Sequence, residues 1–364
     1  MRSRGFVFLL LLALGCSVSI LLVSSCGTKG DENAPTDIRY TCDGTPTQCL
    51  KIGAGWTLDV KISDLVIVDP CVVALADGRF RIYGHVGTSG AGVTYPRHVE
   101  SLISTDGGVT YTLEDGERIV GDADHDAFAP MVVALPNGDF RMYLVDQRTV
   151  VGAEGGTAII SAISSDGLNF TYEPLERLHY QGFGDEIYGI RGGQVVALPD
   201  GTYRMYYSGL TGATSSNLEA KVLSAVSTDG LTFTRESGVR YEPETLCPAP
   251  GKHAANPKVY LDQRGIYHMI LGASACDDVS HTNEKIGIFQ GTSTDGLTFS
   301  FSKAPVVQGY YIKSQYDGHP TDPFINAEDP MLILTPGGFR AYFAAGAVNA
   351  AGVRYYSVTN PGIN

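Results

Sequence analysis

Five copies of one hairpin pattern constrain this 364-residue chain more than any other feature of its sequence. Each copy has an apolar run, a short turn and an alternating run rich in Phe and Tyr, and in three copies the turn is Asp-Gly or Asn-Gly. This pattern is typical of a β-hairpin. The copies lie roughly sixty to seventy residues apart, which indicates a repeat architecture. Their leading residues are Asp69, Ala129, Gly192, Asn256 and Asp329.

A second motif, Ser-x-Asp-Gly followed by an aromatic residue, comes about thirty-five residues after each of the first four leading residues. It begins at Ser104, Ser164, Ser227 and Ser293. The serine and aspartate side chains accept backbone hydrogen bonds, and the glycine supplies a positive φ. We expect the aromatic residue to fill the space between neighbouring sheets. The motif therefore predicts a structural turn, and we assign its aspartates no catalytic role.

Two hairpins per copy make a four-stranded sheet, and sheets arranged radially leave few exposed edges. The sequence therefore predicts an all-β, five-bladed β-propeller with four antiparallel strands per blade. The fifth copy lacks the second motif and one strand. Segment 53–58 aligns with segment 230–235, so we expect an N-terminal strand to complete the last blade and close the ring. A β-sandwich is the structural alternative, against which the near-constant spacing argues.

The N-terminus predicts an exported lipoprotein. Residues 1–25 combine Arg2 and Arg4 with an apolar run, as in a secretory signal. The run ends at Cys26 in a segment that resembles a bacterial lipobox, which implies cleavage and lipidation at this cysteine. Cleavage at Cys16 and an uncleaved membrane helix are the alternatives. We predict a signal peptide over 1–25, a tether over 26–40 and the propeller over 41–364, with the protein lipid-anchored at the bacterial cell envelope, in the outer membrane or at the cell surface.

The net charge limits the kinds of binding partner, and the cysteines indicate candidate disulfides. The formal net charge of −13 argues against nucleic acid, and we expect a monomer that meets the membrane only through its anchor. In an exported protein, cysteines at these spacings are candidates for two disulfides. The pairs are Cys42 with Cys49 and Cys247 with Cys276. The apolar surroundings of Cys71 predict a buried core thiol, and no metal-ligand spacing is present.

The five leading residues are the candidate site. In a propeller the innermost strand of each blade begins at one mouth of the central channel, so these residues converge on the axis. They differ from one another although the surrounding scaffold repeats. Local departures from a regular scaffold are expected where function requires them.

The hairpins at 140–143 and 203–207, the segment 68–70 and the count of five resemble the glycoside hydrolase superfamily of arabinanases, β-xylosidases and invertases. The Ser-x-Asp-Gly motif resembles the Asp-box of sialidases. The first resemblance implies an aspartate base or nucleophile at the first leading position, a second aspartate at the next and a glutamate acid at the third. Asp69 matches the first, whereas Ala129 and Arg191 stand at the other two.

Hydrolysis of a glycosidic bond needs two carboxyl groups beside the anomeric carbon. We predict Asp69 as base or nucleophile and Glu186 as proton donor. Asp126 or Asp329 would hold the pKa difference between them.

Arg191 is expected either to bind the carboxylate of an anionic sugar or to pair with Asp69 or Asp329. Phe128 and Tyr188 are candidates for stacking on sugar rings. His253 and Asn256 would bind sugar hydroxyls or help to hold a central ion. We expect no cofactor, with a structural calcium ion in the channel as the one alternative. The full set of predicted binding residues is Arg191, His125, Phe128, Tyr188, His253, Asn256 and Glu328.

The leading functional hypothesis is a glycoside hydrolase that acts on polysaccharide at the axial mouth. A non-catalytic propeller that binds glycans or mediates cell-surface interactions is the alternative, and a sialidase-like hydrolase of an anionic sugar is a further one. The sequence leaves open whether the site is catalytic and which sugar it takes.

Overall fold

The computed structural model describes ten segments of the chain. All lie in one unit, Cys42–Asn364. They are residues 51–63, 67–86, 97–147, 156–211, 220–242, 254–276, 284–302, 305–308, 326–346 and 354–361. The predicted signal peptide, Cys26, the tether, Cys42, Cys49 and Cys247 fall outside them, and the side chain of Cys276 is not described.

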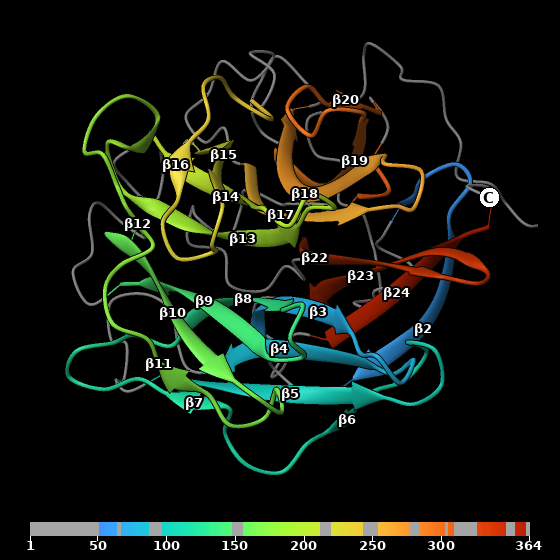
Figure 1. Cartoon of the computed structure of the whole chain (residues 1–364). Helices are drawn as coiled ribbons and strands as arrows, with labels where there is room; N and C mark the ends of the chain where they lie inside the picture. Colours follow the sequence, from blue (N-terminus) through green and yellow to red (C-terminus); the bar gives the residue numbers. More distant parts are fainter. Residues whose placement is uncertain are drawn as a thin grey trace, which may run out of the picture. The chain divides into compact units, whose positions relative to one another are not determined.

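Five antiparallel sheets form the blades of a propeller, as the repeats predict (Figure 1). Blades 1 and 2 each carry a short extra strand, β7 (Ile119–Val120) and β12 (Leu178–His179), and one short 3-10 helix, η1, spans Gly184–Glu186. From the axis outward, blade 1 comprises β3 (Val68–Ala74), β4 (Phe80–Val86), β5 (His98–Ser104) and β6 (Thr112–Leu113). Blade 2 comprises β8 (Phe128–Ala134), β9 (Phe140–Asp146), β10 (Ala158–Ser164) and β11 (Thr171–Tyr172). Blade 3 comprises β13 (Ile190–Ala197), β14 (Tyr203–Leu210), β15 (Ala220–Ser227) and β16 (Thr234–Arg235).

The last two blades recruit strands from the N-terminal side of the chain. Blade 4 comprises β17 (Ala254–Leu261), β18 (Tyr267–Cys276) and β19 (Glu284–Ser293), with β20 (Ser300–Phe301) and β21 (Val307–Gln308) on β19 and β1 (Lys51–Ile52) on β21. Blade 5 comprises β22 (Asn326–Thr335), β23 (Gly338–Gly346), β24 (Arg354–Asn360) and β2 (Thr57–Ser63). Thr57 lies opposite Thr359 in the β2–β24 pair. The predicted ring closure by an N-terminal strand is thereby confirmed, whereas the pairing of β1 with blade 4 was not predicted.

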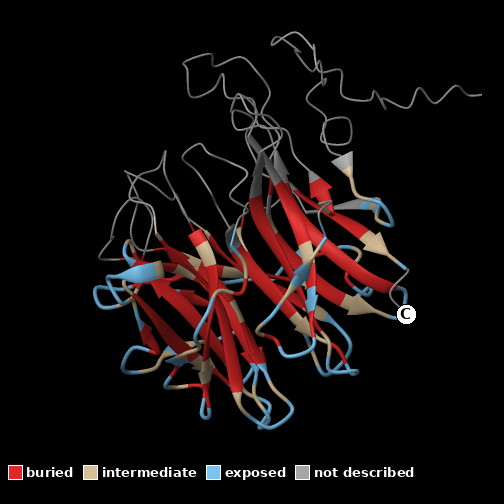
Figure 2. Cartoon of the chain, turned by 90° about the horizontal axis from the view of Figure 1, so that it is seen from above, coloured by how far each residue is buried: buried red, intermediate tan, exposed pale blue. Residues whose placement is uncertain are grey.

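The ring is closed around its axis, because each innermost strand contacts the innermost strands of both neighbouring blades. Apolar side chains fill all five interfaces between blades. Each of the five core clusters combines residues of two adjacent blades; the cluster around Tyr143 and Tyr207, for example, joins blades 2 and 3. Figure 2 shows the strands buried and many of the described turns exposed. Among the described residues no helix has the length and apolar character to cross a membrane.

The Ser-x-Asp-Gly segments form hydrogen-bonded turns. In blade 2 the Ser164 hydroxyl donates to Asp166 at 2.8 Å, and the backbone N–H groups of Leu168 and Asn169 donate to the same carboxylate at 2.7 and 2.9 Å. The φ of Gly167 is 71°, which a side-chain-bearing residue adopts at a cost. The turn geometry that the sequence predicts is therefore present in this blade.

Each of these turns also receives a tyrosine from the preceding blade. Tyr83, Tyr143 and Tyr206 donate to the carbonyl oxygens of Gly167, Gly230 and Gly296 at 2.9, 2.8 and 2.9 Å, and Tyr342 of blade 5 donates to Gly108 of blade 1 at 2.8 Å. The aromatic residue of each turn packs edge-on against the same tyrosine, with ring centroids 5.7 to 6.0 Å apart. We call this bond the inter-blade clasp.

The clasp and its turn are absent together at one interface. Blade 5 has no Ser-x-Asp-Gly sequence, and in blade 4 the position of the clasp tyrosine is held by Ile270. Ile270 is buried in the cluster between blades 4 and 5. Without an acceptor carbonyl a tyrosine here would bury an unsatisfied hydroxyl, which explains the exchange.

Candidate functional site

A bulge of the same form opens every innermost strand and directs the leading residues. The register of each innermost strand shifts at this point, for example between Val68 and Cys71 in blade 1. Four leading residues have a positive φ although none is glycine: 48° at Asp69, 50° at Ala129, 52° at Asn256 and 49° at Asp329. Backbone strain of this kind costs roughly 1–3 kcal/mol per residue and is concentrated at functional sites.

Three leading residues meet at the axis. The side-chain nitrogen of Asn256 donates to Asp69 Oδ1 at 2.6 Å and to Asp329 Oδ1 at 2.7 Å. The backbone N–H of Asp69 donates to Asp329 Oδ2 at 3.3 Å. The three residues come from blades 1, 4 and 5, so the ring must be complete for the cluster to form. The other two leading residues, Ala129 and Gly192, lie against each other and bring no polar side chain.

Asp329 differs in proton affinity from an exposed carboxyl group. Withdrawal from water, followed by the neighbouring charge of Asp69, raises the pKa of Asp329 to about 7. Two carboxylates held this close resist being ionised together. Near pH 7 Asp329 is therefore about half protonated, so it can act as a proton donor in acid–base chemistry on a sugar.

His85 lies behind Asp69. Its Nδ1 is 3.8 Å from Asp69 Oδ2, its side chain is fully buried, and neither ring nitrogen has a hydrogen bond of ordinary geometry. Burial lowers the pKa of His85 to about 4, and Asp69 opposes that change while the charges of Arg97 and Arg191 support it. His85 is therefore neutral above pH 5 and keeps the surroundings of Asp69 free of a further positive charge.

Asp126 is engaged in a buried ion pair. Arg97 donates to it through Nε at 3.0 Å and also through Nη2, and the backbone N–H of Gln147 donates to it at 3.3 Å. Burial raises the pKa of Asp126, and Arg97 opposes the rise. The guanidinium of Arg97 lies over the ring of Phe128 at 4.3 Å. Asp126 thus orders the wall of the mouth through Arg97.

Phe128 offers no surface to a sugar in this arrangement. Its side chain is 2% exposed, with His85 at a ring-centroid distance of 4.6 Å and Arg97 as its other neighbour. Stacking on substrate, which the sequence predicts for this residue, does not fit that burial. The ring packs the site from behind.

Glu186 lies away from the axial cluster. Its Oε1 accepts bonds from Tyr207 at 2.6 Å and from Arg235 at 2.7 Å, and its Oε2 accepts bonds from Gln181 and Arg235. Arg235 lies in β16, the outermost strand of blade 3. These are the contacts of a carboxylate that joins strands, and they do not bring Glu186 to Asp69.

The remaining predicted residues are dispersed. His125 stacks on Tyr172 of β11 at 4.0 Å and contacts Asp122, which places it at the outer part of blade 2. Tyr188 is partly buried beside η1. Arg191 lies in β13 near enough to act on the charge of His85. His253 lies outside the described residues, and the side chain of Glu328, in β22, is not described.

Sequence reasoning missed two buried residues that border the carboxyl cluster, His85 and Lys258. Lys258 is 5% exposed and follows Asn256 by two positions, and its charge acts on both Asp69 and Asp329. A comparison of the repeats two positions beyond their leading residues would have found Lys258. His85 carries no comparable signal, because a histidine in a second strand looks like ordinary packing.

A calcium ion does not fit this point of the channel. The amide of Asn256 occupies the space between the two carboxyl groups, and the Lys258 ammonium already acts on both. Within the ten described segments no group of three His, Cys, Asp or Glu side chains is arranged to hold a metal.

The fold is that of known five-bladed glycoside hydrolases. A thermostable family-43 glycoside hydrolase superposes with a TM-score of 0.57 at 15% identity, over 83% of this chain and 92% of that chain. An endo-arabinase from Bacteroides thetaiotaomicron gives 0.55 at 13% identity, over 83% and 97%. A third structure is from the GH130 family of mannoside phosphorylases, a family that contains glycoside hydrolases targeting β-1,2 mannosidic linkages in Candida mannan. It superposes with a TM-score of 0.52 at 16% identity, over 82% of this chain and 85% of that chain. No protein-family model matches the sequence, and no curated protein matches it.

Proposed function

We propose that this protein is a glycoside hydrolase that acts on polysaccharide at the mouth formed by Asp69, Asn256 and Asp329. One observation carries the proposal: a single amide holds two axial carboxyl groups together, and one of them has a pKa of about 7. The structural likeness to glycoside hydrolases supports the substrate class.

In this proposal Asp329 is the proton donor and Asp69 is the base or nucleophile. Asn256 bonds to one oxygen of each carboxyl group, which fixes both groups and leaves Asp69 Oδ2 for the anomeric carbon or for a water molecule. The two bonded oxygens are no farther apart than the combined length of those two bonds, 2.6 and 2.7 Å. This upper bound lies within the roughly 5–5.5 Å spacing of retaining enzymes and below the wider spacing of inverting ones. We therefore propose retention, with Asp69 as the nucleophile. Glu186 has no part in this mechanism.

The test is a hydrolysis screen of the purified protein on arabinans, xylans, fructans, mannans and uronic-acid polymers. Asp69→Asn and Asp329→Asn should each reduce kcat at least a hundredfold while the protein remains folded. Asp124→Asn is the matched control, because Asp124 is an exposed carboxylate in the loop before β8. Turnover that survives both axial substitutions would refute the assignment.

A glycan that binds saturably but is never cleaved would instead support the non-catalytic function. In a non-catalytic protein the Asp69 carboxylate would accept hydrogen bonds from sugar hydroxyls. Asp69→Asn should then weaken glycan binding. A substrate restricted to anionic sugars would favour the sialidase-like alternative and would assign Arg191 to the sugar carboxylate.

We further propose that the protein is exported and lipid-anchored through Cys26 at the cell envelope. The apolar run before Cys26 supports this. Metabolic labelling with a radioactive fatty acid should mark the wild-type protein and not Cys26→Ser. Equal labelling of the two would assign the lipid to another residue, and Cys16→Ser is the variant to examine next.

A further inference from the structure

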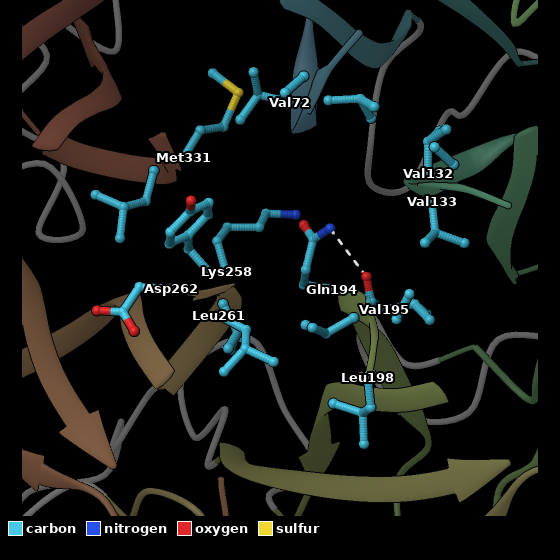
Figure 3. Close-up of a pocket in the computed structure, with 18 of the residues that line it drawn as sticks. Val72, Val132, Val133, Gln194, Val195, Leu198, Lys258, Leu261, Asp262 and Met331 are labelled. Carbon is cyan, nitrogen blue, oxygen red and sulfur yellow. Dashed lines mark hydrogen bonds between the residues drawn. The ribbon is translucent and has the colours of Figure 1, made fainter. Parts of the chain in front are cut away.

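A cavity of about 450 Å³ lies in the axial channel, beyond the carboxyl cluster. Its walls come from the innermost strands of all five blades and from the turns after β13 and β17, always from residues that follow the leading residue (Figure 3). It therefore occupies the part of the channel nearer the hairpin turns. Ala74 and Ala134, which line it, are exposed, so it opens to solvent at that end. The lining segments are 72–74, 132–134, 194–199, 258–263 and 331–332.

A comparison of equivalent positions in the five innermost strands shows which residues near the cavity are repeated and which differ. Three positions after each leading residue the side chain is aliphatic in every blade: Val72, Val132, Val195, Val259 and Leu332. Two positions after it the residues differ: Cys71, Met131, Gln194, Lys258 and Met331. Of these, Gln194, Lys258 and Met331 line the cavity. Divergence on a repeated scaffold marks the leading residues as a site, and the same argument applies to this second layer.

Lys258 and Gln194 are the polar members of that layer. Lys258 is 5% exposed, and its Nζ donates to the backbone oxygen of Gly193 at 2.8 Å. An ammonium has three N–H donors, and this bond uses one. Burial lowers the pKa of Lys258, and the nearby Cys71, Asp69 and Asp329 oppose that change through space. Gln194 accepts a bond from the Cys71 thiol at 3.5 Å and donates to Val195 at 3.3 Å, which leaves it one amide N–H.

A buried ammonium is costly unless it is paired and hydrogen-bonded. Here Lys258 and Gln194 line a cavity whose walls combine aliphatic side chains with Tyr260, Asp262 and Gln263. The carboxylate of Asp262 is already bonded to Arg264 and His268. A site of this size that combines apolar walls with a few polar groups has the character of a small-molecule pocket.

We propose that this cavity is a second ligand site, distinct from the carboxyl cluster, and that it binds a small aliphatic carboxylate. The carboxylate accepts hydrogen bonds from Lys258 and Gln194, and the aliphatic chain lies along Val72, Val133 and Leu332. The inference does not depend on the proposed hydrolase activity, since it uses neither Asp69 nor Asp329.

Isothermal titration of the purified full-length protein tests this site, with hexanoate, hexanamide and inorganic phosphate as probes. Hexanoate should bind saturably, and both other probes should bind at least tenfold more weakly, because hexanamide lacks the charge and phosphate lacks the chain. Equal affinity for hexanoate and hexanamide would overturn the role of Lys258. Equal affinity for hexanoate and phosphate would overturn the role of the aliphatic walls, and absence of hexanoate binding would overturn the site.

Two substitutions locate the binding. Lys258→Met should abolish hexanoate binding, whereas Lys221→Met should leave it unchanged, because Lys221 pairs with Asp185 and Glu242 on blade 3. If Lys258→Met fails to fold, Ala134→Trp decides the matter, since a bulky ring at this exposed lining position blocks the opening without entering the buried core. Hexanoate binding that survives Ala134→Trp in a folded protein would contradict the proposal.

Discussion

The hydroxyl of Tyr143 in blade 2 donates a hydrogen bond to the carbonyl oxygen of Gly230 in blade 3, at 2.8 Å. The ring of the same tyrosine packs edge-on against Phe233, which follows Gly230 in the turn. One side chain thus fixes both the backbone and the aromatic residue of the next blade. Blades that share this clasp are joined by a directional contact as well as by apolar packing.

We expect Tyr143→Phe to lower the free energy of unfolding by about 1–2 kcal/mol, because a buried carbonyl loses its donor while the ring is kept. Urea denaturation followed by circular dichroism measures the change. Tyr180→Phe serves as the control, since the ring of Tyr180 contacts His179 of its own blade. An equal loss in both variants would mean that the clasp contributes nothing specific.

The interface between blades 4 and 5 should reject a clasp tyrosine. Ile270→Tyr places a larger side chain in a fully buried site and gives its hydroxyl no acceptor turn. We expect a loss of about 1–3 kcal/mol in the free energy of unfolding. Ile270→Val, which removes one methylene from the same site, should lose about 0.5–1.5 kcal/mol. A tyrosine variant as stable as the wild type would show that this interface has room and a partner for the hydroxyl.

The raised pKa of Asp329 should make the free energy of unfolding depend on pH. Its pKa is raised from 3.8 to about 7, so between these values the folded protein binds more protons than the unfolded chain. The contribution of Asp329 therefore falls as the pH rises from about 4 to about 7. The difference in unfolding free energy between Asp329→Asn and wild type should shift in favour of the variant over this range. A difference that does not change with pH would contradict the assignment.

His85 should act in the opposite direction. Its pKa is lowered from 6.5 to about 4, so the unfolded chain binds more protons between those values, and stability is lost as the pH falls through that window. In His85→Phe this loss is removed. Denaturation at pH 4.5 and pH 8 should show the variant gaining on the wild type at the lower pH. His179→Phe, at an exposed histidine, is the control and should show no such gain.

The fold could be predicted because its determinants are local and repeated. Turn residues and alternation specify each hairpin, and the Ser-x-Asp-Gly motif specifies the outer turn of four blades. Five copies were therefore enough to predict five blades and the closing role of the N-terminal strand. The strand β1 escaped prediction because two residues at a sheet edge carry no pattern.

The candidate site could be predicted only in part. Asp69, Asn256 and Asp329 were singled out because they lead their strands, and the bulge brings all three to the axis. The position of a residue along the chain does not determine the direction of its side chain. For that reason Phe128 and His125, which also precede or open β8, lie against protein instead of the mouth, and Glu186 lies against Arg235.

In blade 5, Thr57 of β2 pairs with Thr359 of β24. The ring therefore closes only when both ends of the propeller sequence are present. Pairing across such a separation in sequence slows folding. A nascent chain that lacks its last strand holds β2 without a partner, and the Asp69–Asn256–Asp329 cluster cannot assemble before the circle is complete. The same arrangement would keep the site unformed during synthesis, until the whole domain has emerged.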